Sequence, residues 1–112
     1  MPITNPAVLA HPFLKEMFDD TYFPNVVVEK GKQILLRLCE RIEAEKPASA
    51  VAIYVLTHEA TEHFNELAEE FYEHDSEIET AARECIAADV KFILATYGLE
   101  VDLEEAISNR DW

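Results

Sequence analysis

Apolar residues recur along this chain at the three- and four-residue spacing that is typical of amphipathic helices. The longest such stripe lies in residues 48–73 and comprises Ile53, Leu56, Ala60, Phe64, Leu67 and Phe71. Similar stripes predict helices at residues 12–20, 26–45 and 103–109. A further helix is expected between Ser76 and Gly98.

Several residues predict where these helices begin and end. Pro12 suits a first helical turn, and Pro47 stops the helix before it. Ser76 and Glu79 match a capping box, in which Ser76 is the N-cap and Glu79 reaches back to it. Gly98 has the position of a C-terminal glycine stop.

The pattern predicts an all-α fold: a compact bundle of three long helices with short N- and C-terminal helices, in which residues 1–112 form one domain. Gly31 lies inside a predicted helix, where glycine costs about 1 kcal/mol relative to alanine. It marks either a kink or a close helix crossing. The chain contains no internal repeat and no linker that would divide it.

Charge is distributed unevenly. The formal net charge is −14, but residues 1–57 carry 6 basic and 7 acidic side chains, whereas residues 58–112 carry 3 basic and 16 acidic ones. This excess of acid disfavours direct nucleic-acid binding, which depends on Lys and Arg, and disfavours anionic membrane surfaces. It suits a basic partner or a cation.

Neither a signal peptide nor a membrane-spanning run is recognisable, so a cytoplasmic location is expected. Cys39 and Cys85 are expected to be reduced there. Small buried side chains are the favoured interpretation of both, with a redox pair as the alternative.

The segment that contains His58, Glu59, Glu62 and His63 resembles a zinc-protease motif only superficially, because its two histidines are five residues apart rather than four. His58, Glu62 and His63 remain weak metal-ligand candidates, since imidazole and carboxylate are good ligands. No metal or other cofactor is predicted. No phosphate-binding loop or nucleophile elbow occurs, so nucleophilic catalysis has little support and a non-enzymatic role is favoured over an enzymatic one.

Asp89 falls in the middle of the apolar face of the fourth helix, where a carboxylate must be paired or hydrogen-bonded. It is interpreted as a buried tie between helices, with a pocket acid of shifted pKa as the alternative. The candidate partners are Arg37, Arg41, Arg83, Arg110, the tyrosines and His63.

An acidic stripe follows the third helix and is the candidate binding surface. It comprises Glu59, Glu62, Glu66, Glu69, Glu70 and Glu73, and it continues through Asp75, Glu77, Glu79 and Glu84. A solvated face is the alternative interpretation. Arg110 and Trp112 form either a surface anchor pair or a terminal contact with the core.

Residues 31–35, 54–61, 64–71 and 75–84 resemble a family of small bacterial proteins whose function is unknown. The resemblance extends over nearly the whole chain and implies a bacterial, single-domain protein. It implies no activity, cofactor or catalytic residue.

Three hypotheses follow. The first is a non-enzymatic interaction module, of inhibitor or immunity type, for a basic protein. The second is a small metal-binding or enzymatic bundle that uses His58, Glu62, His63 or Asp89. The third is a structural homo-oligomer.

Overall fold

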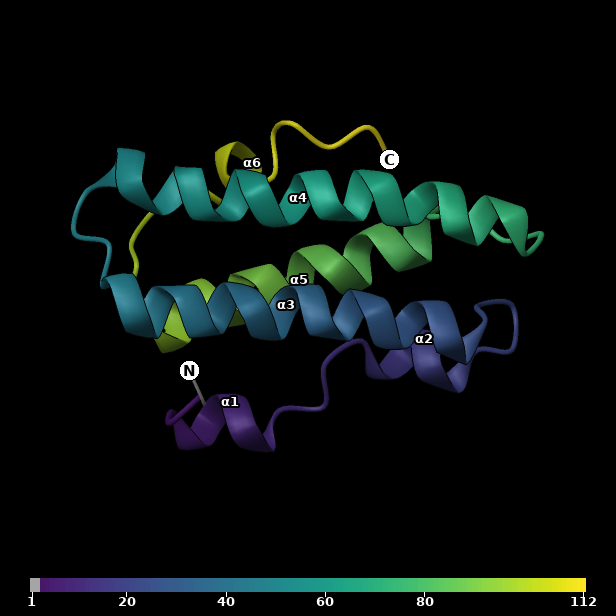
Figure 1. The fold of residues 1–112 in the computed structure, drawn as a ribbon, viewed down its shortest axis with the longest axis horizontal. Coiled ribbons are helices and arrows are strands. Elements are labelled where there is room, and N and C mark those ends of the chain that lie inside the picture. Colours follow the sequence, from purple (N-terminus) through teal and green to yellow (C-terminus); the bar gives the residue numbers. More distant parts are fainter. Residues whose placement is uncertain (1–2) are drawn as a thin grey trace.

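Two long helices, α3 (Asn25–Glu45) and α4 (Ala50–Glu73), lie side by side and antiparallel in a computed structural model that describes residues 3–112 (Figure 1). The turn that joins them contains Pro47, as predicted. Lys46 adopts the left-handed conformation (φ 48°) at the end of α3, and the Ser49 hydroxyl caps α4 by accepting from the Ala52 amide at 3.1 Å. The long predicted helices are therefore confirmed, although α4 begins at Ala50 rather than at residue 48.

The third long helix, α5 (Thr80–Thr96), lies behind this pair in the view of Figure 1. The short helices α1 (Pro6–Ala10) and α2 (Lys15–Asp19) pack along α5, and α2 also contacts α3. The C-terminal helix α6 (Leu103–Ala106) packs on α4 and α5. Residues 3–112 contain helices and no strand, which confirms the all-α prediction, and none of these helices is both long and apolar enough to cross a membrane.

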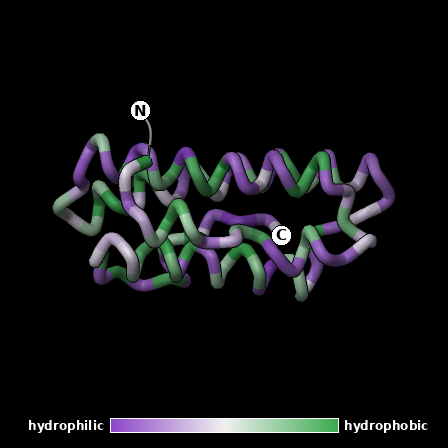
Figure 2. Tube along the Cα trace, turned by 90° about the horizontal axis from the view of Figure 1, so that it is seen from below, coloured by the Kyte–Doolittle hydropathy of each residue, from purple (hydrophilic) through white to green (hydrophobic). Residues whose placement is uncertain are grey.

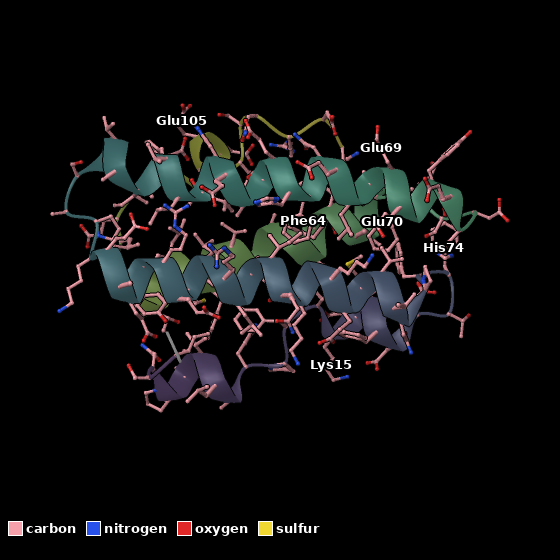
Figure 3. All side chains as sticks on the ribbon, in the orientation of Figure 1. Lys15, Phe64, Glu69, Glu70, His74 and Glu105 are labelled. Atoms are coloured by element: carbon pink, nitrogen blue, oxygen red, sulfur yellow. The ribbon has the colours of Figure 1, made fainter. Side chains whose placement is uncertain are left out.

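The core forms where the apolar helix faces meet. Hydrophobic and hydrophilic residues alternate turn by turn along the long helices (Figure 2). Phe64 and Phe71 of α4, Leu35 of α3, and Ile86 and Ile93 of α5 are almost completely buried. In Figure 3, Phe64 lies between α3 and α4. The predicted apolar stripes are therefore the faces through which the long helices pack against one another.

Gly31 marks a close helix crossing, one of the two interpretations offered by the sequence. A β-carbon at this position would lie 3.0 Å from Cδ1 of Leu14 and 3.2 Å from Cε1 of Phe64. The glycine is buried within α3. It allows α4 and the start of α2 to approach the α3 backbone together.

The predicted helix at residues 12–20 is only partly correct. Regular helix in this region is confined to α2, and Leu14 enters it from the left-handed conformation (φ 56°). Pro12 lies outside any helix. Helix α1 lies outside the predicted helices. Its sequence signal is Asn5 followed by Pro6, and the Asn5 side chain accepts from the amides of Ala7 and Val8.

The capping-box prediction at Ser76 and Glu79 is wrong. The Ser76 amide instead donates to the carbonyl of Phe71 at 2.8 Å, and Asp75 adopts φ 59°, so both residues end α4. The carboxylate of Glu79 accepts from the hydroxyl of Tyr22 at 2.9 Å. Glu79 itself is the N-cap of α5, and its side chain forms no capping hydrogen bond with that helix.

The last part of the chain contains the end of α5, the short helix α6 and a terminal tryptophan. Gly98 (φ 68°) ends α5: its amide donates to the carbonyl of Ala95, and the amide of Leu99 donates to the carbonyl of Leu94, which confirms the predicted stop. The last helix ends at Ala106, three residues earlier than expected. Trp112 packs edge-on against Phe64, with 6.1 Å between ring centroids. Trp112 therefore contacts the core, and the guanidinium carbon of Arg110 also lies 6.0 Å from the centroid of its ring.

Candidate functional site

The acidic surface consists of exposed carboxylates along one face of α4 and in the segments beside its C-terminal end. Its members are Glu62, Glu66, Glu69, Glu73, Asp75, Glu77 and Asp111. The spacing of the four α4 members, four, three and four residues, places them on one side of the helix. Within residues 3–112, none of these seven carboxylates accepts a hydrogen bond or forms an ion pair. The acidic surface is therefore electrostatically uncompensated.

Two of the six predicted surface glutamates lie elsewhere. Glu59 forms an ion pair with Arg41 of α3, and Glu70 accepts from Nζ of Lys30 at 2.5 Å. Figure 3 shows the difference: Glu69 lies on the side of α4 away from α3, and Glu70 on the side facing it. These two glutamates join α4 to α3, which leaves Glu62, Glu66, Glu69 and Glu73 as the outward group.

Tyr72 stands in the middle of the acidic surface and is 71% exposed. It lines two hollows. One, of about 550 Å³, also involves Glu69, Glu73 and Asp111. The other, of about 400 Å³, has Asp75, Glu77, Glu79 and Tyr22 in its wall. The structure thus places an exposed aromatic ring between two acid-lined depressions.

Sequence reasoning did not single out Tyr72. Its signal was an aromatic residue one position before Glu73, just outside the apolar stripe that ends at Phe71. A tyrosine beside a stripe is normally part of the core edge, and only the structure shows that this ring projects into solvent.

The acidic surface destabilises the isolated chain. Like charges three or four residues apart on a helix repel by about 0.2–0.5 kcal/mol per pair. Glu62 with Glu66, Glu66 with Glu69, and Glu69 with Glu73 are three such pairs, and they have no cation among them within the described residues. A binding partner that supplies positive charge would remove this repulsion.

Asp89 is a buried tie, as the sequence predicts, but none of the expected partners holds it. Its side chain accepts from the amide of Leu14 at 2.7 Å and lies 2.8 Å from Nε2 of His11. The His11 ring stacks on Phe92 at 3.8 Å. Asp89 is 8% exposed and both oxygens are engaged, so it fixes the segment between α1 and α2 onto α5.

The weak metal candidates point in different directions. His58 contacts the C-terminal segment, with Nε2 2.7 Å from the carbonyl oxygen of Glu105, and its ring stacks on Tyr54. His63 lines a groove between α3 and α4, and Glu62 belongs to the acidic surface. Across residues 3–112, no group of three or more His, Cys, Asp and Glu side chains is arranged to hold a metal ion.

Glu43 forms a second tie between distant segments. It accepts from the amide and hydroxyl of Thr4, both at 2.9 Å, and from the amide of Asn5 at 3.3 Å. The hydroxyl of Tyr97 is a further donor. Burial alone would raise the pKa of Glu43, but these hydrogen bonds outweigh it and lower that pKa to about 2.

Both cysteines are free thiols. Burial, the largest cause in each case, raises the pKa of Cys39 to about 12 and that of Cys85 to about 12. Cys39 lies beside Tyr97, and Cys85 beside Glu16 with 3.6 Å between sulfur and carboxylate oxygen. Different surroundings and high pKa values favour the structural interpretation of each thiol over a redox pair.

The comparisons with known proteins give a family and no activity. Residues 7–112 match a family described as a family of unknown function (DUF5713). No curated protein and no solved structure shows a significant match.

Proposed function

Because the chain belongs to this family of unknown function, we propose its role from its geometry: it is an interaction module that binds a basic protein through the acidic surface. One observation carries the proposal, namely the exposed ring of Tyr72 between two hollows lined by carboxylates, all of which are unpaired within residues 3–112 except Glu79.

Three physical properties support this role. Tyrosine is enriched among residues that dominate binding energy, because its ring buries a large area and loses little conformational entropy. Uncompensated carboxylates attract and orient a positively charged partner before contact. The hollows beside Tyr72 have room for Lys or Arg side chains, whose charges would meet Glu69, Glu73 and Glu77.

The same features favour a different protein over a second copy of this chain. Two acidic surfaces brought together would repel each other. Within the class, an inhibitor or immunity-type protein would use such a surface to cover a basic working face of its target. The cytoplasm of a bacterium is the setting that we propose, with no direct contact to nucleic acid or membrane.

The test compares two triple variants that remove equal charge. Glu62→Gln, Glu66→Gln and Glu69→Gln together neutralise the acidic surface; Glu84→Gln, Glu100→Gln and Glu105→Gln remove exposed, unpaired carboxylates elsewhere. Each protein, with wild type and Tyr72→Ala, is used as bait in an extract of the source organism, and captured proteins are identified by mass spectrometry and then purified for titration.

We expect a basic protein that binds wild type and the control triple, dissociates at high salt, and is lost from the surface triple and from Tyr72→Ala. If the surface triple binds the purified partner as tightly as the control triple does, the acidic surface is not the binding site.

A further inference from the structure

A groove between α3 and α4 has a different character from the acidic surface. It has a volume of about 270 Å³, and its floor is formed by Ile34 and Leu38 of α3 with Leu56 and Ala60 of α4. Leu38, Leu56 and Ala60 belong to the buried core, whereas Ile34 is half-buried. The floor is therefore a small apolar strip that is continuous with the packed interior.

The walls of this groove are basic in an acidic protein. Lys30, Arg37 and Arg41 line it together with one carboxylate, Glu59, and with His63. The three cations are a third of the 9 Lys and Arg residues of a chain whose net charge is −14. By contrast, the charged residues that line the two hollows beside Tyr72 are all acidic.

Two of these cations are already paired and hold the groove in shape. Nε of Arg41 lies 2.7 Å from Glu45, and its guanidinium also pairs with Glu59 across the groove. Lys30 pairs with Glu70 of α4. The pairs of Lys30 with Glu70 and of Arg41 with Glu59 tie α3 to α4 along the groove and neutralise these two cations. Arg37 is left as the cation of the groove that forms no ion pair within residues 3–112.

Arg37 of α3 and His63 of α4 both line the groove. Both are exposed, and within residues 3–112 neither forms a hydrogen bond or an ion pair. Both act on the same carboxylate: the hydrogen bond from Arg41 is the main cause that lowers the pKa of Glu59, and the charges of His63 and Arg37 lower it further. Both side chains therefore line the groove near Glu59, and both have donors that no hydrogen bond uses.

We propose that this groove binds a small amphipathic anion, a carboxylate attached to a short alkyl or aryl body. The apolar body lies on the strip of Ile34, Leu38, Leu56 and Ala60, and the carboxylate accepts from Arg37 and His63. A guanidinium binds a carboxylate through two parallel hydrogen bonds, which suits this role. The volume lies near the lower limit of about 300 Å³ for ligand pockets, which restricts the ligand to a small molecule.

The test uses octanoate as the probe and octan-1-ol as its uncharged counterpart. Backbone amide shifts of labelled protein are followed during titration with each compound. We expect octanoate to shift amides along residues 30–41 of α3 and 56–63 of α4, and octan-1-ol to bind at least several-fold more weakly. Arg37→Gln should weaken octanoate binding at least about tenfold, because both charge-assisted hydrogen bonds of the guanidinium are lost.

Lys91→Gln is the matched control, because Lys91 is exposed and unpaired within residues 3–112 and lies on α5. It should bind octanoate as wild type does. The proposal fails if octanoate shifts no amide of the groove, if octan-1-ol binds equally well, or if Arg37→Gln and Lys91→Gln behave alike. The surface triple variant should retain octanoate binding, so this result and that of the partner experiment are independent.

Discussion

The imidazole of His11 lies 2.8 Å from the carboxylate of Asp89, across 78 residues of sequence. The other carboxylate oxygen accepts a hydrogen bond from the amide of Leu14. Leu14 is the residue just before α2, and its backbone is in the left-handed conformation. A single buried side chain of α5 therefore determines the path of the chain between α1 and α2. That path in turn brings Leu14 against the Gly31 backbone.

Removal of the Asp89 carboxylate should destabilise the fold. Asp89→Ala leaves the Leu14 amide without an acceptor in a buried place, at a cost of about 1–3 kcal/mol. Asp89→Asn keeps one acceptor and should lose less, whereas Glu84→Ala on the exposed side of α5 should change stability by under about 0.5 kcal/mol. Urea unfolding measures all three. Full stability in Asp89→Asn would contradict a charged tie.

Gly31→Ala should lower stability although alanine is the better helix former. The gain in propensity is about 1 kcal/mol. The new methyl group would lie 3.0 Å from Leu14 and 3.2 Å from Phe64, both buried, and overpacking of this kind costs about 1–3 kcal/mol. Thermal unfolding of Gly31→Ala and the larger Gly31→Val should show successively lower midpoints; a higher midpoint for Gly31→Ala would show that the crossing is looser than described.

Glu43 should make stability depend on acid pH. Its folded pKa of about 2 lies below the ordinary value of 4.5, so its contribution is complete above about pH 4.5 and disappears as pH falls toward 2. Wild type should be more stable than Glu43→Gln at neutral pH, and the difference should shrink over this window. Urea unfolding at a series of pH values measures it, with Glu100→Gln as the exposed control. If the stability difference between wild type and Glu43→Gln did not change with pH, the lowered pKa of Glu43 would not be the cause of the acid sensitivity.

Neutralising the acidic surface should stabilise the isolated protein. The triple variant Glu62→Gln, Glu66→Gln and Glu69→Gln removes three like-charged pairs, each of which costs about 0.2–0.5 kcal/mol. The melting temperature should therefore rise at low salt, and the rise should diminish at high salt, where the charges of wild type are screened. Unchanged melting at low salt would mean that the carboxylates do not repel appreciably.

The sequence predicted the long helices because their apolar periodicity is a local property and fixes which faces are buried. It also predicted that Asp89 must be a buried tie, because a carboxylate inside an apolar face has few alternatives. Its partner could not be predicted, since His11 and the Leu14 amide come from a segment with no periodic link to α5. The Ser76 error has a similar origin: the residue ends α4 through Phe71. A capping pattern read from Ser76 to Glu79 does not reveal that Ser76 is already part of the C-terminal end of α4.

In the candidate site, too, local features could be predicted from the sequence and features that depend on helix packing could not. Acid on the outer side of α4 follows from helical spacing, but the pairing of Glu59 and Glu70 with α3 depends on how the helices pack. The hollows beside Tyr72 and the groove lined by both Arg37 and His63 likewise require two elements placed together. No single-helix pattern contains that information.

The ties of the N-terminal segment bear on how the chain acquires its structure during synthesis. The hydrogen bond of Thr4 needs Glu43, which follows 39 residues later in the sequence, and that of Leu14 needs Asp89, which follows 75 residues later. Contacts so distant in sequence form slowly, because a long loop must close before they stabilise anything. The segment at residues 11–14 therefore reaches its final place only after α5 has been made. Until α5 is made, Phe13 lacks its ring contact with Phe92 and is less buried than in the folded protein, which makes the nascent chain prone to misassociation at that stage.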